Sequence, residues 1–201
     1  EPLRGGSLAK LPNRIVDELK ERMPSESVAS WAFRFAGTPE NVLTVLSGMT
    51  YMEHLRDNLR TYSPLVPLTA DDMEFLEKVA ESLSKYPLVP CTGCQYCMPC
   101  PYGIDIPGNF SHYNKCVNEG YTVSEPDGDS NECTEEMKAY RRARRAYLVS
   151  YDRSIEKIRQ ANRCIGCGQC ISHCPQDIKI PSELHRIDHL VENLRRHSDR
   201  L

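Results

Sequence analysis

The chain has 201 residues, a formal net charge of −3 and a hydrophobic content of 40%. A chain of this length folds into one or two domains with a core of ordinary size. The charge balance excludes a general affinity for nucleic acid or anionic membrane, and no apolar run approaches the ~20 residues of a membrane span. Because the sequence opens on Glu1, we expect a fragment of a longer protein or the product of a truncated gene.

Apolar periodicity predicts two helices near the start of the chain. The first ends at Pro24, and its apolar stripe consists of Ile15, Leu19 and Met23. The second is capped by Ser25 or Ser27. Its buried stripe, at positions i, i+3, i+4 and i+7, is expected to be Val28, Trp31, Ala32 and Phe35.

Residues 42–46 form a short apolar run rich in β-branched side chains, which predicts a strand buried on both faces, as in a parallel sheet. Thr50 and Glu53 have the spacing of a capping box, and Thr69 and Asp72 make a similar start to a second helix. The apolar positions of these two helices are Met52, Leu55, Leu59, Met73, Leu76, Val79 and Leu83. The helix–strand–helix order is typical of an α/β unit.

Residues 85–90 form a linker into a cysteine-rich part, so we expect one domain at 1–85 and a second at 86–201. Eight of the cysteines fall in two runs, each followed by a proline: Cys91, Cys94, Cys97 and Cys100, then Cys164, Cys167, Cys170 and Cys174. The second run has the bacterial ferredoxin spacing, in which three thiolates hold one iron–sulfur cluster and the fourth holds its neighbour. The runs therefore predict two 4Fe–4S clusters and electron transfer.

The two runs are also an internal repeat. The first three cysteines correspond at an offset of 73, and the segments 100–107 and 174–181 share the pattern C-P-x-x-I-x-I-P at an offset of 74. A pseudo-two-fold pair of this kind suits crossed ligation, in which each run lends its last cysteine to the other cluster. The first run has one residue fewer before its last cysteine, which leaves open whether Cys100 reaches the far cluster.

The rest of the second domain is expected to be helical. Phe110, Tyr113 and Val117 face one way in a helix that ends at Gly120, and residues 122–132 form an exposed loop. A long helix is predicted over 134–162, and a last helix starts at Ser182 and carries Leu184, Ile187, Leu190, Val191 and Leu194. The basic run Arg141, Arg142, Arg144 and Arg145 is either a solvated helix face or a docking patch for an acidic redox partner.

Zinc and disulfides are the alternatives to iron–sulfur clusters. A single C-x2-C pair is as typical of zinc, although two tight runs of four that each end in Cys-Pro are unusual for zinc. The sequence has no secretory signal, which disfavours disulfides. Cys116 and Cys133 lie outside the runs and are expected to be buried or free thiols.

Five segments give the chain a family resemblance. They are Glu-Pro-Leu-Arg-Gly-Gly at 1–6, Ala-Ser-Trp-Ala-Phe-Arg-Phe at 29–35, Val-Leu-Ser-Gly-Met at 45–49, Asp-Asn-Leu at 57–59 and the cysteine segment 91–107. In this order they resemble the C-terminal portion of aldo/keto reductases that carry a ferredoxin-like tail. The resemblance implies a fold that is mostly α with a small α/β part: the last segment of a (β/α)8 barrel, followed by an α-helical two-cluster domain.

The resemblance also implies a site for NAD(P)H in the intact parent protein. Leu3, Gly5 and Gly6 would approach the pyrophosphate after strand seven, and Ser47 and Gly48 would form a phosphate-binding turn after strand eight. Asn58 would correspond to the family's adenine-contacting asparagine. Many members have a basic residue just after this turn, where Met49 and Thr50 stand here, so the choice between NAD and NADP stays open.

The family's catalytic residues belong to the first half of the barrel, which this sequence does not include, so we assign no catalytic residue and leave enzymatic activity open. The expected partners are that N-terminal barrel half and a redox protein, in a reducing compartment such as the cytoplasm. One alternative is an autonomous ferredoxin-like electron carrier without catalytic activity. The other is a structural module that binds zinc.

Overall fold

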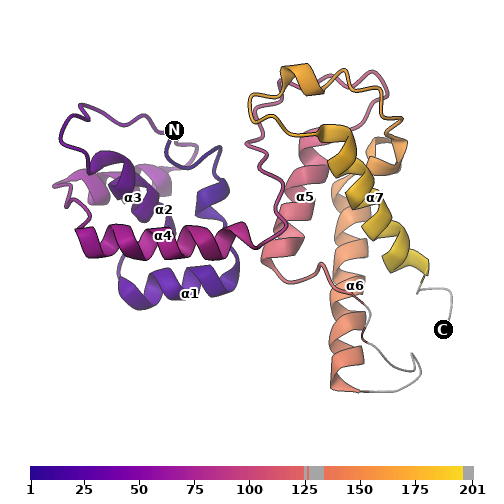
Figure 1. The fold of residues 1–201 in the computed structure, drawn as a ribbon, viewed down its shortest axis with the longest axis horizontal. Coiled ribbons are helices and arrows are strands. Elements are labelled where there is room, and N and C mark those ends of the chain that lie inside the picture. Colours follow the sequence, from indigo (N-terminus) through magenta and orange to yellow (C-terminus); the bar gives the residue numbers. More distant parts are fainter. Residues whose placement is uncertain (125, 127–133, 197–201) are drawn as a thin grey trace. The chain divides into compact units, whose positions relative to one another are not determined.

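The computed structural model describes residues 1–124, 126 and 134–196. The chain divides into two compact units, Glu1–Pro87 and Leu88–Leu201 (Figure 1). This division falls close to the boundary that the sequence predicts after residue 85. All the regular elements among the described residues are helices. The only β-type pairing in this part of the chain is an isolated antiparallel bridge between Tyr62 and Leu65.

The first unit contains four α-helices and a short 3-10 helix. They are η1 (Ser7–Ala9), α1 (Asn13–Arg22), α2 (Val28–Gly37), α3 (Met52–Tyr62) and α4 (Ala70–Ser84). The core cluster joins α1, α2 and α4 through Ile15, Leu19, Trp31, Leu68 and Val79. The rings of Trp31 and Phe75 lie 5.5 Å apart, which brings α4 against α2. Burial of these side chains removes apolar surface from water and holds the helices together.

Two of the predicted helix starts are confirmed. The Ser27 Oγ accepts a hydrogen bond of 3.0 Å from the Ser30 backbone N–H at the start of α2. At α4 the Asp72 N–H donates to the Thr69 Oγ1 at 3.1 Å, while the Asp72 carboxylate accepts from the Thr69 N–H at 3.1 Å. This reciprocal capping box satisfies two backbone donors that a helix otherwise leaves unpaired.

The predicted strand at residues 42–46 is wrong for the described structure, and no barrel segment is present there. The run has no regular secondary structure, and Leu43 is 99% exposed and Leu46 73% exposed. A strand is stable only when a neighbouring strand pairs with its backbone. The described residues supply no such neighbour, so the apolar run stays extended and exposed. The prediction of a small α/β part is corrected accordingly to an all-helical unit.

Two details of the neighbouring helices also differ from prediction. In α2 the buried phenylalanine is Phe33, 2% exposed, whereas Phe35 is 51% exposed, because the Phe33 ring packs edge-to-face with Tyr62, with the ring centres 6.1 Å apart. The helix α3 starts at Met52, and its N-cap Tyr51 makes no side-chain capping bond, so the predicted Thr50–Glu53 box is absent. The predicted apolar stripe of α3 is exposed in the same way as the run that precedes it.

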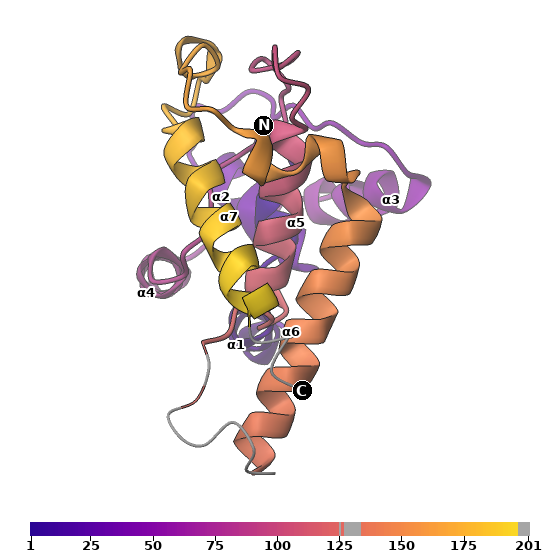
Figure 2. The ribbon, with the colours of Figure 1, turned by 90° about the vertical axis from the view of Figure 1, so that its right-hand side faces the viewer.

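The second unit is built on three long helices, α5 (Ile106–Asn118), α6 (Glu135–Ser154) and α7 (Ile180–Arg196). Three short 3-10 helices lie in the segment between α6 and α7: η2 (Lys157–Arg159), η3 (Ala161–Arg163) and η4 (Ile171–His173). Figure 2 shows α5, α6 and α7 side by side, with the cysteine-bearing loops gathered at the end where α5 and α7 begin. Pro107 and Pro181 stand in the first turns of α5 and α7, where proline's missing N–H costs no helical bond.

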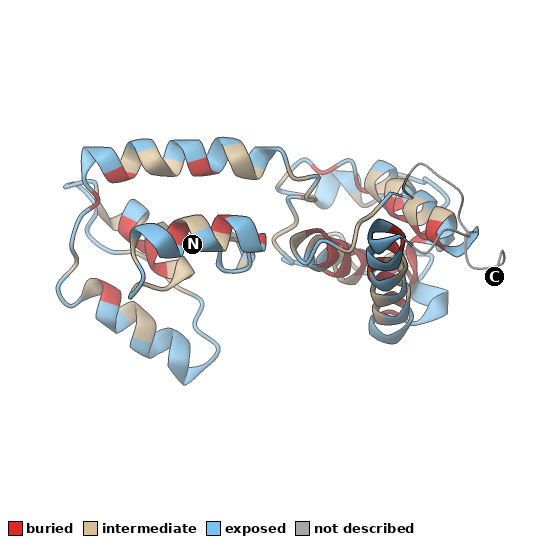
Figure 3. Cartoon of the chain, turned by 90° about the horizontal axis from the view of Figure 1, so that it is seen from below, coloured by how far each residue is buried: buried red, intermediate tan, exposed pale blue. Residues whose placement is uncertain are grey.

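The core of the second unit lies between the facing sides of these helices (Figure 3). Its largest buried side chains include Phe110, Tyr147, Tyr151, Leu184 and Ile187. The predicted apolar stripes of α5 and α7 are confirmed, apart from a half-buried Leu190. None of the helices in the described part of the chain has the length and apolarity that crossing a membrane requires.

Helix bounds in this unit differ from those predicted. The long helix ends at Ser154 rather than at residue 162, because Ile155 turns extended and is 3% exposed. The last helix begins at Ile180, two residues before the predicted cap at Ser182. The loop predicted at 122–132 falls largely outside the described residues, as does Cys133.

Candidate metal centre

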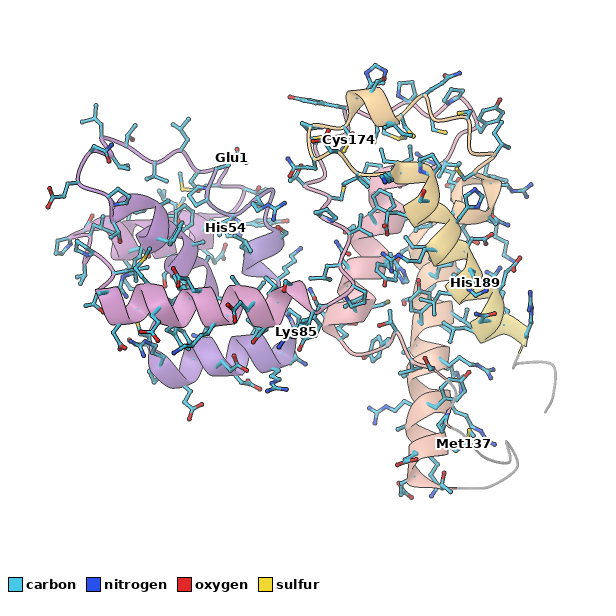
Figure 4. All side chains as sticks on the ribbon, in the orientation of Figure 1. Glu1, His54, Lys85, Met137, Cys174 and His189 are labelled. Carbon is cyan, nitrogen blue, oxygen red and sulfur yellow. The ribbon has the colours of Figure 1, made fainter. Side chains whose placement is uncertain are left out.

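The two cysteine runs lie in loops at one end of the second unit. Figure 4 labels Cys174 in these loops, beyond the first turns of α5 and α7. The entry of the first loop is fixed to α5 by a half-buried amide. Asn114 of α5 accepts from the Val89 N–H at 2.8 Å and donates to the Val89 carbonyl at 2.7 Å, immediately before Cys91.

Four cysteines from both runs line one cavity. Three come from the first run, Cys91, Cys94 and Cys97, and the fourth is Cys174 from the second run. The remaining wall is mainly apolar, with Ile106 and Phe110 from α5 and Ile178 and Ile180 before and at the start of α7. The cavity therefore combines four soft sulfur donors with a wall that limits access of water.

The other four cysteines form a second group. Burial is the main cause that raises the pKa of Cys170, and the negative charges of Cys164, Cys167 and Cys100 raise the Cys170 pKa further. A charge acts on a thiol in this way only at short range. Cys100 thus lies near the second run, which mirrors the position of Cys174 beside the first run. The shorter first run leaves open whether Cys100 reaches the far cluster, and ligation of that cluster requires this proximity to the second run.

Two thiols of the first run, Cys91 and Cys97, have a raised pKa. Burial, with smaller contributions from Cys91 and Cys170, raises the pKa of Cys97 to about 11. Burial also raises the pKa of Cys91, with Cys94 and Cys174 adding to the effect. Because the thiolate is the metal-binding form, loading of the site releases protons and is favoured at higher pH.

The repeat extends to the conformation of the backbone. Gly93 and Gly166, at equivalent places in the two runs, have φ of 71° and 76°. Gln95 and Gly168, the next equivalent pair, have φ of 65° and 76°. Their carbonyls accept equivalent turn bonds, 2.9 Å from Met98 N–H and 3.0 Å from Ile171 N–H. Sequence reasoning identified the repeat but missed the left-handed Gln95, since glutamine carries no signal for that conformation.

A buried hydrogen-bond chain joins the two loops. The Asn109 amide donates to the Arg159 carbonyl at 3.0 Å, and its oxygen accepts from the Tyr151 hydroxyl at 2.7 Å. The Tyr151 hydroxyl in turn accepts from the Ala161 N–H at 3.0 Å, just before the second run. The Asp105 N–H, just after the first run, also donates to Arg159, at 3.1 Å. The loops are therefore held in register by α5 and α6.

The cysteine geometry does not fit a single ion. Among the residues that the structure describes, no three His, Cys, Asp or Glu side chains lie close enough to share one metal ion. Four thiolates around zinc would each lie ~2.3 Å from it and hence in mutual contact. The described thiols are not gathered in that way, so their arrangement does not favour zinc.

The residues predicted to contact a nicotinamide nucleotide lie in the first unit. The Asn58 amide donates to the Ser47 hydroxyl at 3.0 Å, and Gly48 lies beside the Glu1 carboxylate. Leu3, Gly5 and Gly6 belong to a tight turn in which the Gly6 N–H donates to the Leu3 carbonyl at 2.9 Å. The structure thus pairs Ser47 with Asn58, and Leu3 and Gly6 are half-buried within their turn.

Cys116 and the arginine run lie away from the cysteine loops' ligand groups. Cys116 is 1% exposed and its Sγ is 3.6 Å from His112 Nε2 in the core, as expected for a buried thiol. Arg141, Arg142 and Arg145 line a shallow hollow along α6 together with Arg153. Arg144 is half-buried and is not among the residues of that hollow, so the run does not form one face.

Comparison with known proteins identifies the metal-binding region. Residues 90–178 match the family model of the 4Fe-4S dicluster domain, and this segment includes all eight cysteines of the two runs. No curated protein and no solved structure is significantly similar to the chain. Residues 90–178 are therefore a 4Fe–4S dicluster domain, which binds two 4Fe–4S clusters through the two cysteine motifs.

Proposed function

We propose that the chain transfers single electrons through its two clusters. The observation that carries this proposal is the gathering of cysteines from both runs around one apolar-walled cavity. Each cluster supplies one-electron chemistry when bound, and this chain's residues hold it, exclude water from one side and fix its position. The two loops are tied to one another by Asn109 and Tyr151, which would keep the clusters at a constant separation.

In this proposal the ligands are crossed between the runs. Cys91, Cys94, Cys97 and Cys174 hold one cluster, and Cys164, Cys167, Cys170 and Cys100 hold the other. The shared cavity supports the first set, and the influence of Cys100 on Cys170 supports the second. Cys170, the third cysteine of the second run, also raises the pKa of Cys97, the third cysteine of the first run, which indicates that the two groups adjoin.

The experiment is anaerobic reconstitution with iron and sulfide, followed by metal analysis and EPR of the dithionite-reduced protein. The proposal expects about eight iron and eight sulfide per chain, brown colour and two interacting S = 1/2 signals. A colourless protein that binds stoichiometric zinc would reject it. A controlled-potential titration then gives one electron per cluster.

A second proposal concerns the first unit. We propose that residues 1–87 serve an aldo/keto reductase-type oxidoreductase whose barrel is supplied by further polypeptide, in a reducing compartment such as the cytoplasm. The family resemblance supports it, and so does the exposure of the apolar run at Val42, Leu43 and Leu46, since such runs are normally covered. A hydride carries two electrons and each cluster accepts one, so the clusters would serve a separate one-electron partner.

Binding of NADPH or NADH to the full chain tests the nucleotide part of this proposal. The expected result is a change in nucleotide fluorescence that weakens in Asn58→Ala. Equal signals from Asn58→Ala and the unchanged chain would contradict the assignment of Asn58. The same measurement with both nucleotides decides between NAD and NADP, a choice that Met49 and Thr50 leave open.

A further inference from the structure

The two cysteine loops differ sharply in charge. From Tyr86 to Ile104 the first loop has no charged residue, and it exposes Tyr96 and Tyr102. From Lys157 to Gln176 the second loop has Lys157, Arg159 and Arg163 and no acidic residue. A chain with a net charge of −3 therefore concentrates positive charge beside one of its two metal groups.

These three cations are exposed and lie outside ion pairs. Within the described part of the chain, Lys157, Arg159 and Arg163 make no salt bridge, whereas many exposed cations elsewhere are paired, such as Lys78 with Glu74 at 2.7 Å. No salt bridge to another described residue therefore neutralises their charge. The nearest acidic residues along the chain, Glu156 and Asp177, flank the segment rather than interrupt it.

The backbone beneath the cations is rigidly held. Gln160, 2% exposed, donates to the Ile155 carbonyl at 3.1 Å and to Asp152 at 3.0 Å. The Ala161 N–H is bound by Tyr151, and the Arg159 carbonyl accepts from Asn109. A charge displayed on an anchored segment loses little conformational entropy when a partner binds, which favours its use in recognition.

Exposed apolar side chains accompany the charges. Ile158 is 67% exposed, Ile165 62% and Ile171 44%, and Ile165 and Ile171 stand next to the ligand cysteines Cys164 and Cys170. Cys167 is itself exposed. Apolar contact points surrounded by charges of one sign are the composition of a transient protein interface.

We propose that this surface, made of Lys157, Ile158, Arg159, Arg163, Ile165 and Ile171, docks an acidic one-electron redox protein. The proposal rests on the proposed function and assigns the exchange of electrons to the cluster held by Cys164, Cys167, Cys170 and Cys100. One electron passes from that cluster to the partner's oxidised centre, without proton transfer or bond making. The rate of electron transfer falls steeply with distance, so the partner must bind directly over the cluster. The arginines along α6 do not flank that cluster.

The test compares two triple variants that change the formal charge equally. Lys157→Glu/Arg159→Glu/Arg163→Glu alters the proposed surface, and Arg141→Glu/Arg142→Glu/Arg145→Glu alters the α6 hollow. The probes are two one-electron acceptors, an acidic blue-copper protein and a basic cytochrome c. Stopped-flow spectroscopy records reduction of Cu(II) to Cu(I), or of the haem, by the dithionite-reduced chain at low ionic strength.

For the first variant we expect the second-order rate with the acidic acceptor to fall about tenfold or more and the rate with cytochrome c to rise. For the α6 variant we expect less than about a twofold change, since those charges lie outside the docking surface. NMR titration of the already reduced copper protein with the oxidised chain gives a binding readout in which no electron moves. Its affinity should fall in the first variant alone.

Equal losses in both variants would overturn the proposal, because net charge alone would then explain the rates. A larger loss in the α6 variant would also overturn it and assign docking to the hollow. Iron, sulfide and EPR measurements on each variant separate this result from failure of the proposed function. If the charge-reversed loop does not load its cluster, the corresponding glutamine variants repeat the comparison with a smaller expected loss.

Discussion

Gln95 and Gly168 occupy equivalent positions in the two cysteine loops and share a left-handed backbone, with φ of 65° and 76°. Each follows the second cysteine of its run, and each carbonyl accepts the turn bond that brings the next cysteine round. Glycine adopts this conformation at little cost, whereas a residue with a Cβ does not. The two loops therefore share a backbone conformation, but its conformational free energy is higher at Gln95 than at Gly168.

This difference predicts that substitutions at the two positions change the free energy of unfolding in opposite directions. Gly168→Ala should lower the free energy of unfolding by about 1 kcal/mol or more, and Gln95→Gly should raise it or leave it unchanged. Gln95→Ala keeps the Cβ and removes the amide, so it separates backbone strain from side-chain contacts. Anaerobic thermal unfolding of the loaded protein measures all three. Equal destabilisation by Gln95→Gly and Gly168→Ala would contradict the shared conformation.

The two buried tyrosines of α6 provide a matched pair. Tyr151 donates to Asn109 at 2.7 Å and accepts from the Ala161 N–H at 3.0 Å, whereas the Tyr147 hydroxyl has no partner among the described residues. Tyr151→Phe should cost about 1–3 kcal/mol, because it leaves a buried donor and acceptor unpaired.

Tyr147→Phe removes a hydroxyl that makes no hydrogen bond to a described residue, so the free energy of unfolding should stay the same or rise. Denaturant unfolding followed by circular dichroism compares the two variants. In Tyr151→Phe we also expect faster loss of cluster absorbance, since Ala161 leads directly into the second cysteine run. A larger loss in Tyr147→Phe than in Tyr151→Phe would contradict the hydrogen bonding described for α6.

His112 predicts a pH dependence of stability. Burial, with a smaller effect of Lys115, lowers the pKa of His112 from 6.5 to about 4. Between these values the unfolded chain binds a proton that the folded chain excludes, so stability falls as the pH drops from about 6.5 towards 4. The loss should not exceed about 3 kcal/mol.

His112→Gln removes this titration while keeping a hydrogen-bonding group for Ser150, which lies 2.9 Å from the ring nitrogen. The slope of stability against pH in this window should be shallower in His112→Gln than in the unchanged protein. Identical slopes in His112→Gln and the unchanged protein would show that His112 is accessible to protons in the fold.

Cys116 offers a control for cluster binding. Its thiol is buried on α5 beside His112, and burial raises its pKa to about 11, so it is neither accessible nor ionised at neutral pH. Cys116→Ser should therefore keep the full iron and sulfide content, whereas Cys167→Ser should lose one cluster. Metal analysis of the reconstituted proteins checks both, and equal iron in the two variants would reject the ligand assignment.

Local signals in the sequence were sufficient for the helix caps at Ser27 and Thr69 and for the metal-binding region, although the similar pattern at Thr50 and Glu53 forms no capping box. Ser27 and the Thr69–Asp72 pair act through bonds within a few residues, so their patterns predict their structure. The cysteine spacing and the C-P-x-x-I-x-I-P repeat predict where the ligands lie, because the ligands themselves must surround one group.

Features that depend on distant neighbours could not be predicted in the same way. The run at 42–46 has the composition of a buried strand, but a strand needs a partner that the described residues do not provide. Phe33 replaces Phe35 in the core because Tyr62, from another helix, covers it. The chain from Asn109 through Tyr151 to Ala161 joins three separate segments, and no local pattern identifies it.

The most direct test of the crossed arrangement is EPR-monitored redox titration of single-cysteine variants. Cys174→Ser and Cys91→Ser should perturb the same cluster signal and the same midpoint potential, because both thiols line one cavity. Cys164→Ser should perturb the other signal. If Cys174→Ser instead alters the signal that Cys164→Ser alters and leaves that of Cys91→Ser intact, each run holds its own cluster and the crossed ligation is wrong.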